Sequence, residues 1–242
     1  MPLRFIQGNS AIAGVAHFPG AASFPCPFTS NNGQGNLLFA FISAKTGTRP
    51  SSVTDTAGNN WQEIAQPNNV GDNFSLYCVQ SCKPGPNTVS ANGMTVTVAG
   101  GPNICIAEFA LPVCTPCGIG ITGFNPPRSN SGFAAPFLKA FCVYNQTEGP
   151  FFQTIIFGLY DNADGGANVA RTWASTSTLI VQETRVVAES AEDGGNNTSC
   201  LAYSTVPYPY TYNECQLAPT PTSPALYGDE TYPLWALVNT LA

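Results

Sequence analysis

The chain has 242 residues, of which only 9% are charged and 43% are apolar, and its formal net charge is −6 at pH 7. A typical soluble domain carries about 25% charged residues, so uncharged polar residues, Gly and Pro replace the missing charge here. Nucleic-acid binding is excluded because the 8 basic residues are scattered. Membrane insertion is excluded because no apolar run approaches the roughly 20 residues that span a bilayer.

The first strong element is the run NLLFAFISA at residues 36–44. A continuous apolar run of this length predicts a strand that is covered on both sides. The next strand pattern is NFSLYCVQ at residues 73–80. This pattern predicts a strand with Phe74, Leu76 and Cys78 on one face and Ser75, Tyr77 and Val79 on the other.

A hairpin is predicted next, from NTVSA at 87–91 and MTVTVA at 94–99, with Asn92-Gly93 between them. Asn-Gly supplies the two positive φ angles of a type I′ turn, which joins antiparallel strands with the correct twist. Further strand patterns follow, separated by Gly- and Pro-rich turns, at residues 104–111, 137–144, 153–160, 177–187 and 234–242.

About a dozen short strands without helical signals predict an all-β fold, a single β-sandwich of jelly-roll type. We expect one domain over residues 1–242, since no linker divides the chain and no convincing internal repeat is found. Gly/Asn-rich loops are predicted at 163–170 and 190–199. The Pro-rich segment 216–233 is predicted to be an extended arm or loop, because Pro disfavours helices and central strands.

The stretch VTDTAGNNW at residues 53–61 has two interpretations. A Ca²⁺ loop gathers six to eight oxygens, usually with several carboxylates, but Asp55 is the only carboxylate here. Asp at the start of a turn, followed by Gly and Asn, is fully explained by turn chemistry. We therefore expect a turn and no metal site.

Several motifs between residues 8 and 111 occur in a particular order, namely GNSAIAGVA, GNLLFAFIS, VTDTAGNNW, FSLYCVQSCKPGPNTVSA and ICIAEF. This order resembles a family of β-sandwich proteins from bacteria and their phages, in which a GNLLV-type strand precedes a VTDSAGN-W turn and a GxNTVT strand. The later QTIIFGLYD and the closing strand with Trp235 fit the rest of that pattern. The resemblance implies a sandwich with a surface or structural role. It carries over no catalytic residues and does not include the cysteines.

Nine cysteines are many for a cytosolic protein and predict disulfides formed in an oxidising environment, with at least one thiol left over or bonded to a neighbouring chain. They are Cys26, Cys78, Cys82, Cys105, Cys114, Cys117, Cys142, Cys200 and Cys215. Cys114-Thr-Pro-Cys117 lies between strands, so thioredoxin-like catalysis is not expected. With Cys78 and Cys82 it could form a Cys₄ zinc site, but the spacing is loose and disulfides are favoured.

An enzyme is not expected, and neither is a cofactor. His17 is the only histidine, and there is no G-x-S-x-G motif, so a hydrolase triad would have to pass through it. Glu108 is the only acid well inside an apolar strand, and no second carboxylate accompanies it as in sandwich glycosidases. We expect a buried Glu that is paired with an Arg or a backbone donor.

Aromatic residues offer a different function, carbohydrate binding by stacking of flat rings on sugars. The candidates are Trp61, Trp173, Trp235, Tyr208, Tyr210 and Tyr212. Aromatic residues at strand ends are more often core or interface anchors, which we favour here.

The function expected from these observations is that of a disulfide-stabilised structural subunit, which self-assembles into an extracellular filament or on a virion surface. Its partners would be copies of itself or other structural subunits. A surface with little charge is poorly protected against association. MPLRFIQGNS has no signal-peptide pattern, so a mature form, an unconventional route or release in a particle would explain export. The alternative is an adhesion module that binds surface glycans.

Overall fold

The structure is a computed structural model. It describes the backbone of residues 4–12, 23–44, 49–65, 73–94 and 103–110 and of the strands named below from residue 119 onward. Side chains are described at residues 4–11, 23–42, 49–63, 75–94 and 104–110. All regular elements in this part of the chain are strands, and all their pairings are antiparallel. No helix in it could span a membrane. The all-β prediction is confirmed for these residues.

Residues 4–110 form two sheets. The large N-terminal sheet has the order β1-β8-β3-β6-β5, made of β1 (Arg4–Ile12), β8 (Asn103–Ala110), β3 (Leu37–Ala44), β6 (Asn73–Val79) and β5 (Gln62–Ala65). The small N-terminal sheet has the order β2-β7-β4, made of β2 (Ser23–Pro27), β7 (Thr88–Asn92) and β4 (Ser52–Asp55). The two sheets enclose a shared core, which is compatible with a β-sandwich.

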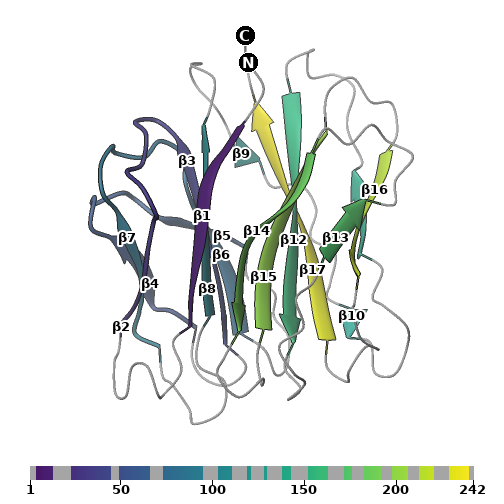
Figure 1. The fold of residues 1–242 in the computed structure, drawn as a ribbon, viewed down its shortest axis with the longest axis horizontal. Helices are drawn as coiled ribbons and strands as arrows, with labels where there is room; N and C mark the ends of the chain where they lie inside the picture. The colour runs from purple at the N-terminus through teal and green to yellow at the C-terminus, as the bar shows by residue number, and fades with distance from the viewer. Residues whose placement is uncertain are drawn as a thin grey trace.

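The rest of the chain also forms two sheets. The large C-terminal sheet has the order β10-β17-β12-β15-β14, made of β10 (Arg128–Ser129), β17 (Asp229–Asn239), β12 (Phe152–Asn162), β15 (Thr198–Val206) and β14 (Glu183–Ala191), and β9 (Ile119–Gly120) also pairs with β17. The small C-terminal sheet has the order β11-β16-β13, made of β11 (Leu138–Cys142), β16 (Asn213–Thr220) and β13 (Thr172–Ser175). Figure 1 shows the four sheets as successive layers from left to right, with the two large sheets in the middle.

Both faces of the three central strands of the large N-terminal sheet, β8, β3 and β6, are buried. One face packs on the small N-terminal sheet, with Leu38, Ala40, Ile42, Tyr77, Val79, Ile104 and Ile106 in the shared core. The other face carries Leu37, Phe39, Phe41, Leu76, Cys78, Cys105, Ala107 and Phe109, each at most 1% exposed. On that side β14 lies against β1 and β8. The predicted strand at 36–44 is confirmed as β3, with burial on both sides at residues 37–42, and the predicted alternation is confirmed for residues 75–79.

The predicted type I′ turn at Asn92-Gly93 is wrong. Gly93 has a φ of +68°, but no described residue other than glycine has a positive φ, so Asn92 keeps an extended backbone. The reason lies in tertiary pairing, because β7 is the central strand of the small N-terminal sheet. Asn92 is held there between Ser23 of β2 and Ser52 of β4. Residues 95–99 lie outside the described residues.

The predicted Pro-rich arm at 216–233 lies partly in strands. Residues 216–220 belong to β16 and residues 229–233 to β17, while 221–228 lie outside the described residues. Pro219 pairs only with Trp173 of β13 and Pro233 only with Gly158 of β12 in the described ladders, so each has a partner strand on one side alone, as Pro has at a sheet edge. Of the two loops predicted at 163–170 and 190–199, only residues 190–191 and 198–199 are described, and they belong to β14 and β15. The single-domain assignment stays a prediction.

Candidate functional site

The Asp55 carboxylate closes the turn that follows β4. Its Oδ1 accepts a hydrogen bond from the backbone N of Asn59 at 2.8 Å. Its Oδ2 accepts from Asn59 Nδ2 at 2.7 Å, Trp61 Nε1 at 2.9 Å and Asn87 Nδ2 at 3.0 Å. The backbone N of Gly58 also donates to the carbonyl of Asp55, at 3.2 Å. Because four N–H donors already occupy the carboxylate, its chemistry is that of a turn, as predicted.

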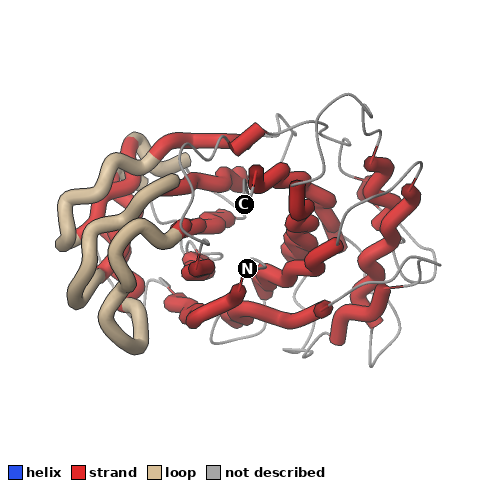
Figure 2. The backbone as a smooth tube through the Cα atoms, turned by 90° about the horizontal axis from the view of Figure 1, so that it is seen from above, coloured by secondary structure: helices blue, strands red, loops and turns tan. Residues whose placement is uncertain are grey.

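The same turn is tied to the segment before β7. Asn59 Oδ1 accepts a hydrogen bond from the backbone N of Lys83 at 2.8 Å, and Lys83 Nζ donates to the carbonyl of Gly58 at 2.7 Å. Asn32 and Gly85 form a bridge with backbone hydrogen bonds of 2.8 and 3.0 Å. These bonds join three loops into one surface, residues 28–36, 56–61 and 80–87, which we call the loop end. Figure 2 shows the described loops gathered at one end of the long axis.

The hydrogen bonds of the Asp55 carboxylate predict that the free energy of unfolding falls in acid. Burial raises the pKa of its carboxyl, but the hydrogen bonds from Asn59, Asn87 and Trp61 outweigh burial and hold the pKa below its usual value. The resulting stabilisation is complete above the unfolded-state pKa of about 3.9 and is lost as the pH falls through the lower folded-state pKa. We expect Asp55→Asn to cost about 1–2 kcal/mol at neutral pH, because the side chain is only half-buried.

Urea denaturation of wild type and Asp55→Asn between about pH 6 and pH 2 measures this effect. The difference in unfolding free energy between the two proteins should shrink on acidification. A difference that stays constant over this range would contradict the role of the charged carboxylate.

The second polar cluster surrounds Glu108, which is fully buried in β8. Its Oε2 accepts hydrogen bonds from Gln7 Nε2 at 2.5 Å and Asn32 Nδ2 at 2.7 Å. Its Oε1 accepts from the backbone N of Gly33 at 2.8 Å and from Asn36 Nδ2 at 2.5 Å. The expectation of an Arg or a backbone donor is met by the backbone N of Gly33, and the other three donors are side-chain amides.

The Glu108 cluster anchors the segment between β2 and β3 to the large sheet. Gln7 Oε1 accepts hydrogen bonds from the backbone N of Ser30 at 2.9 Å and from Thr29 Oγ1 at 3.0 Å. A Cβ at Gly33 would lie 2.7 Å from Asn36 Nδ2, so glycine allows this close approach. With four donors on its two oxygens and no solvent contact, Glu108 has no free position for a substrate. Its geometry is that of an anchor.

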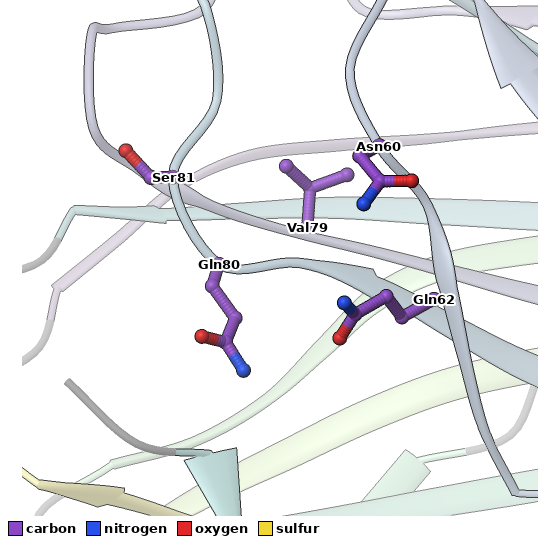
Figure 3. Close-up of a pocket in the computed structure, with 5 residues that line it drawn as sticks. All are labelled: Asn60, Gln62, Val79, Gln80 and Ser81. Atoms are coloured by element: carbon purple, nitrogen blue, oxygen red, sulfur yellow. The ribbon is translucent and has the colours of Figure 1, made fainter.

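A shallow pocket of about 180 Å³ opens beside the loop end and is lined by Asn60, Gln62, Val79, Gln80 and Ser81. Figure 3 shows Ser81 and Asn60 on either side of Val79, and Gln80 and Gln62 below it on opposite sides. The four polar residues are exposed. Sequence reasoning did not predict this pocket, because isolated Asn and Gln residues at strand ends carry no pattern.

The four cysteines with described side chains, Cys26, Cys78, Cys82 and Cys105, are buried, and none is in a disulfide bond. The disulfide prediction is thus not met at these positions, where the side chains act as small apolar core residues. Burial raises the pKa of Cys26 to about 12 and those of Cys78 and Cys82 to about 11, and Glu108 adds to the effect at Cys82. The pairing of Cys114, Cys117, Cys142, Cys200 and Cys215 lies outside the described side chains.

These pKa values predict slow thiol chemistry. Since the thiolate is the nucleophile, we expect Cys26, Cys78 and Cys82 to resist iodoacetamide at pH 8 in the native protein and to react fully in urea. We expect the same of Cys105 because its side chain is fully buried. Mass spectrometry of tryptic peptides measures the modified fraction at each position. Rapid native labelling of Cys26 or Cys78 would contradict the buried, protonated state.

Of the aromatic residues predicted as glycan or interface contacts, only Trp61 has a described side chain. Trp61 is partly buried against the shared core and is fixed by its bond to Asp55, so it is a core anchor. Trp173 lies in β13, with its side chain outside the described set. His17, Tyr208, Tyr210 and Tyr212 lie outside the described residues. The described part holds no group of three or more His, Cys, Asp or Glu that could bind a metal, and the proposed zinc ligands Cys114 and Cys117 are outside it.

Charge is sparse on the described surface. Among the exposed residues with described side chains, only Arg4, Glu63 and Lys83 are charged.

Comparisons of the chain with protein-family models, curated proteins and solved structures give no match. The family resemblance given above therefore stays a prediction.

Proposed function

We propose that the chain is a non-enzymatic structural subunit, which self-assembles into or decorates an extracellular filament or a virion surface. The observation that carries this proposal is the nearly uncharged exterior, with Arg4, Glu63 and Lys83 as the charged exposed residues of the described part. Like charges that would keep copies apart are scarce, so close packing of neutral polar faces costs little desolvation of ions.

One jelly-roll-type sandwich was predicted over residues 1–242, and the strand pairing within residues 4–110 supports a jelly roll for that part of the chain. β1 pairs with β8, β2 with β7 and β3 with β6, as in a long hairpin that is wrapped into two sheets. β4 and β5 are separated, because β5 pairs with β6 in the large sheet. Eight-stranded jelly rolls occur in viral capsid proteins and in lectins. This analogy suits both a structural subunit and a glycan-binding module.

The test of self-assembly is sedimentation velocity over a wide concentration range, with electron microscopy of the same samples. We expect concentration-dependent, ordered oligomers. Gln34→Lys with Ser81→Lys adds charge to the exposed loop end and should weaken assembly if this face is used, whereas Glu63→Gln removes an exposed charge and should leave assembly intact. A monodisperse monomer at high concentration would refute the proposal.

The second candidate is glycan binding, favoured by the pocket of Asn60, Gln62, Gln80 and Ser81. Carboxamides both donate and accept hydrogen bonds, which matches the hydroxyl groups of a neutral sugar. A glycan array with wild type and with Gln62→Ala/Gln80→Ala tests it, with the exposed Gln34→Ala as control. Binding that is lost only in the double variant supports this function, and an array without hits removes it.

A further inference from the structure

The two halves of the chain have the same strand order. In the large sheets, β1-β8-β3-β6-β5 is matched by β10-β17-β12-β15-β14. In the small sheets, β2-β7-β4 is matched by β11-β16-β13. Each strand from β1 to β8 therefore has a counterpart from β10 to β17, taken in sequence order. Sequential strands can be arranged in two sheets in many ways, so one arrangement that occurs twice calls for an explanation.

Local irregularities repeat as well. The pairing of β5 with β6 contains a register shift between Glu63 and Ala65. The counterpart pairing of β14 with β15 contains a register shift between Val186 and Ala188. Such bulges are specific features of a fold, and these two fall on the fifth strand of each set. A further shift, between Phe5 and Gln7 of β1, has no counterpart in the two-residue ladder of β10.

The connections between strands also correspond in length. Residues 28–36 join β2 to β3, and residues 143–151 join β11 to β12. Residues 56–61 join β4 to β5, and residues 176–182 join β13 to β14. Sheet order alone does not require this agreement.

The counterpart of β1 is divided into two pieces. β9 pairs with β17 at Val238 and Leu237, and β10 pairs with it at Thr231 and Glu230. β12 pairs with these same residues, so β9 and β10 both lie on the other edge of β17. Together they occupy the edge of β17 that β1 occupies on β8.

We propose that the chain consists of two copies of one fold unit, residues 4–110 and 119–239, and that the apolar outer face of the first large sheet is the binding surface for the second copy. Phe39, Phe41 and Phe109 lie on this face and are fully buried. β14 and β15 of the second copy lie against β8. The arrangement is that of a dimer of like units within one chain, with the two small sheets on the outside (Figure 1).

The two copies differ at the polar cluster. At the shared register shift, Tyr77 of β6 corresponds to Ala202 of β15. Tyr77 pairs with Ala40 and Ala202 pairs with Gly158, which aligns β3 with β12. Two positions earlier, Leu38 pairs with Glu108 and Ile156 pairs with Trp235, so Trp235 takes the position of Glu108 and the carboxylate is not repeated in the second copy.

The test uses the full chain with a protease recognition site inserted into residues 111–118. After cleavage, we expect the two fragments to elute as one complex, with hydrogen exchange in β1–β8 unchanged. Phe39→Ala should raise the dissociation constant of the cleaved halves at least about tenfold, because truncating a central, buried aromatic anchor has effects of this size. Phe39→Asp with Phe41→Asp should separate the halves.

Leu38→Ala is the matched control, since Leu38 is the neighbouring residue, is also fully buried and faces the small N-terminal sheet. It should destabilise the first copy but change the dissociation constant by less than Phe39→Ala does. Loss of sheet structure on cleavage, separation of the unsubstituted halves, or equal effects of Phe39→Ala and Leu38→Ala on dissociation would each overturn the proposal. None of these outcomes depends on whether the intact chain self-assembles.

Discussion

Glu108→Gln is expected to destabilise the folded protein by about 3–5 kcal/mol, the range seen when a buried, hydrogen-bonded charge loses its partners. In wild type, all four groups around the carboxylate are N–H donors, from Gln7, Asn32, Gly33 and Asn36. A carboxamide replaces one of the two acceptor oxygens by an NH₂ group, which then faces two donors.

One effect stabilises the Glu108→Gln variant relative to wild type. Gln carries no charge, so the variant avoids the cost of burying an anion, which is several kcal/mol per ion. The wild-type carboxylate, however, recovers this cost through four charge-assisted hydrogen bonds, each worth about 1.5–3 kcal/mol. The variant loses two of them and leaves buried donors without acceptors, so destabilisation dominates.

Equilibrium unfolding in urea at pH 7 measures the effect. Glu63→Gln is the matched control, because it makes the same chemical change at an exposed position, where the carboxamide oxygen can still accept the hydrogen bond from Tyr77. It should stay within about 0.5 kcal/mol of wild type. A loss below about 1 kcal/mol for Glu108→Gln would show that the amide donors find other partners, and the anchoring role would be wrong.

The features that were predicted correctly from the sequence depend on residues that are close together in the chain. The strand at 36–44 follows from its apolar run, and the turn at Asp55 follows from residues within a few positions of each other. The carboxylate of Asp55 bonds Asn59 and Trp61, both visible in the same short motif. Here local preference and the global fold agree, which is the normal condition for a foldable sequence.

The features that were predicted wrongly or missed depend on pairing between residues that are far apart in the chain. The Asn92-Gly93 turn was wrong because Asn92 is held by two strands that are distant in sequence. The partners of Glu108 come from β1 and from the segment before β3, and no spacing rule connects Gln7 with Glu108. The repeated strand order was missed for a similar reason. Counterpart strands share their pairing but differ in residue type at single positions, as Glu108 and Trp235 show.

Phe109→Ala is expected to cost about 3–5 kcal/mol, as is usual when a fully buried Phe is truncated. Phe109 lies on the outer face of the large N-terminal sheet and packs edge-to-face against Phe5, with ring centroids 5.6 Å apart, and against Phe39, at 5.8 Å. Truncation removes both ring contacts and leaves a cavity in close-packed surroundings, which relax only in part.

Two further variants test whether the position of Phe109 between two sheets causes this loss of stability. Phe109→Leu keeps most of the volume and should cost less than half as much, while Phe5→Ala removes a ring that is only partly buried and should also cost less. Thermal unfolding followed by circular dichroism gives the order of the three variants. If Phe5→Ala were the most damaging of the three, the centre of this apolar face would not be at Phe109.

Because β14 and β15 cover β8 on this side, Phe109→Ala should also destabilise the large C-terminal sheet, which hydrogen exchange would detect as faster exchange in β14 and β15.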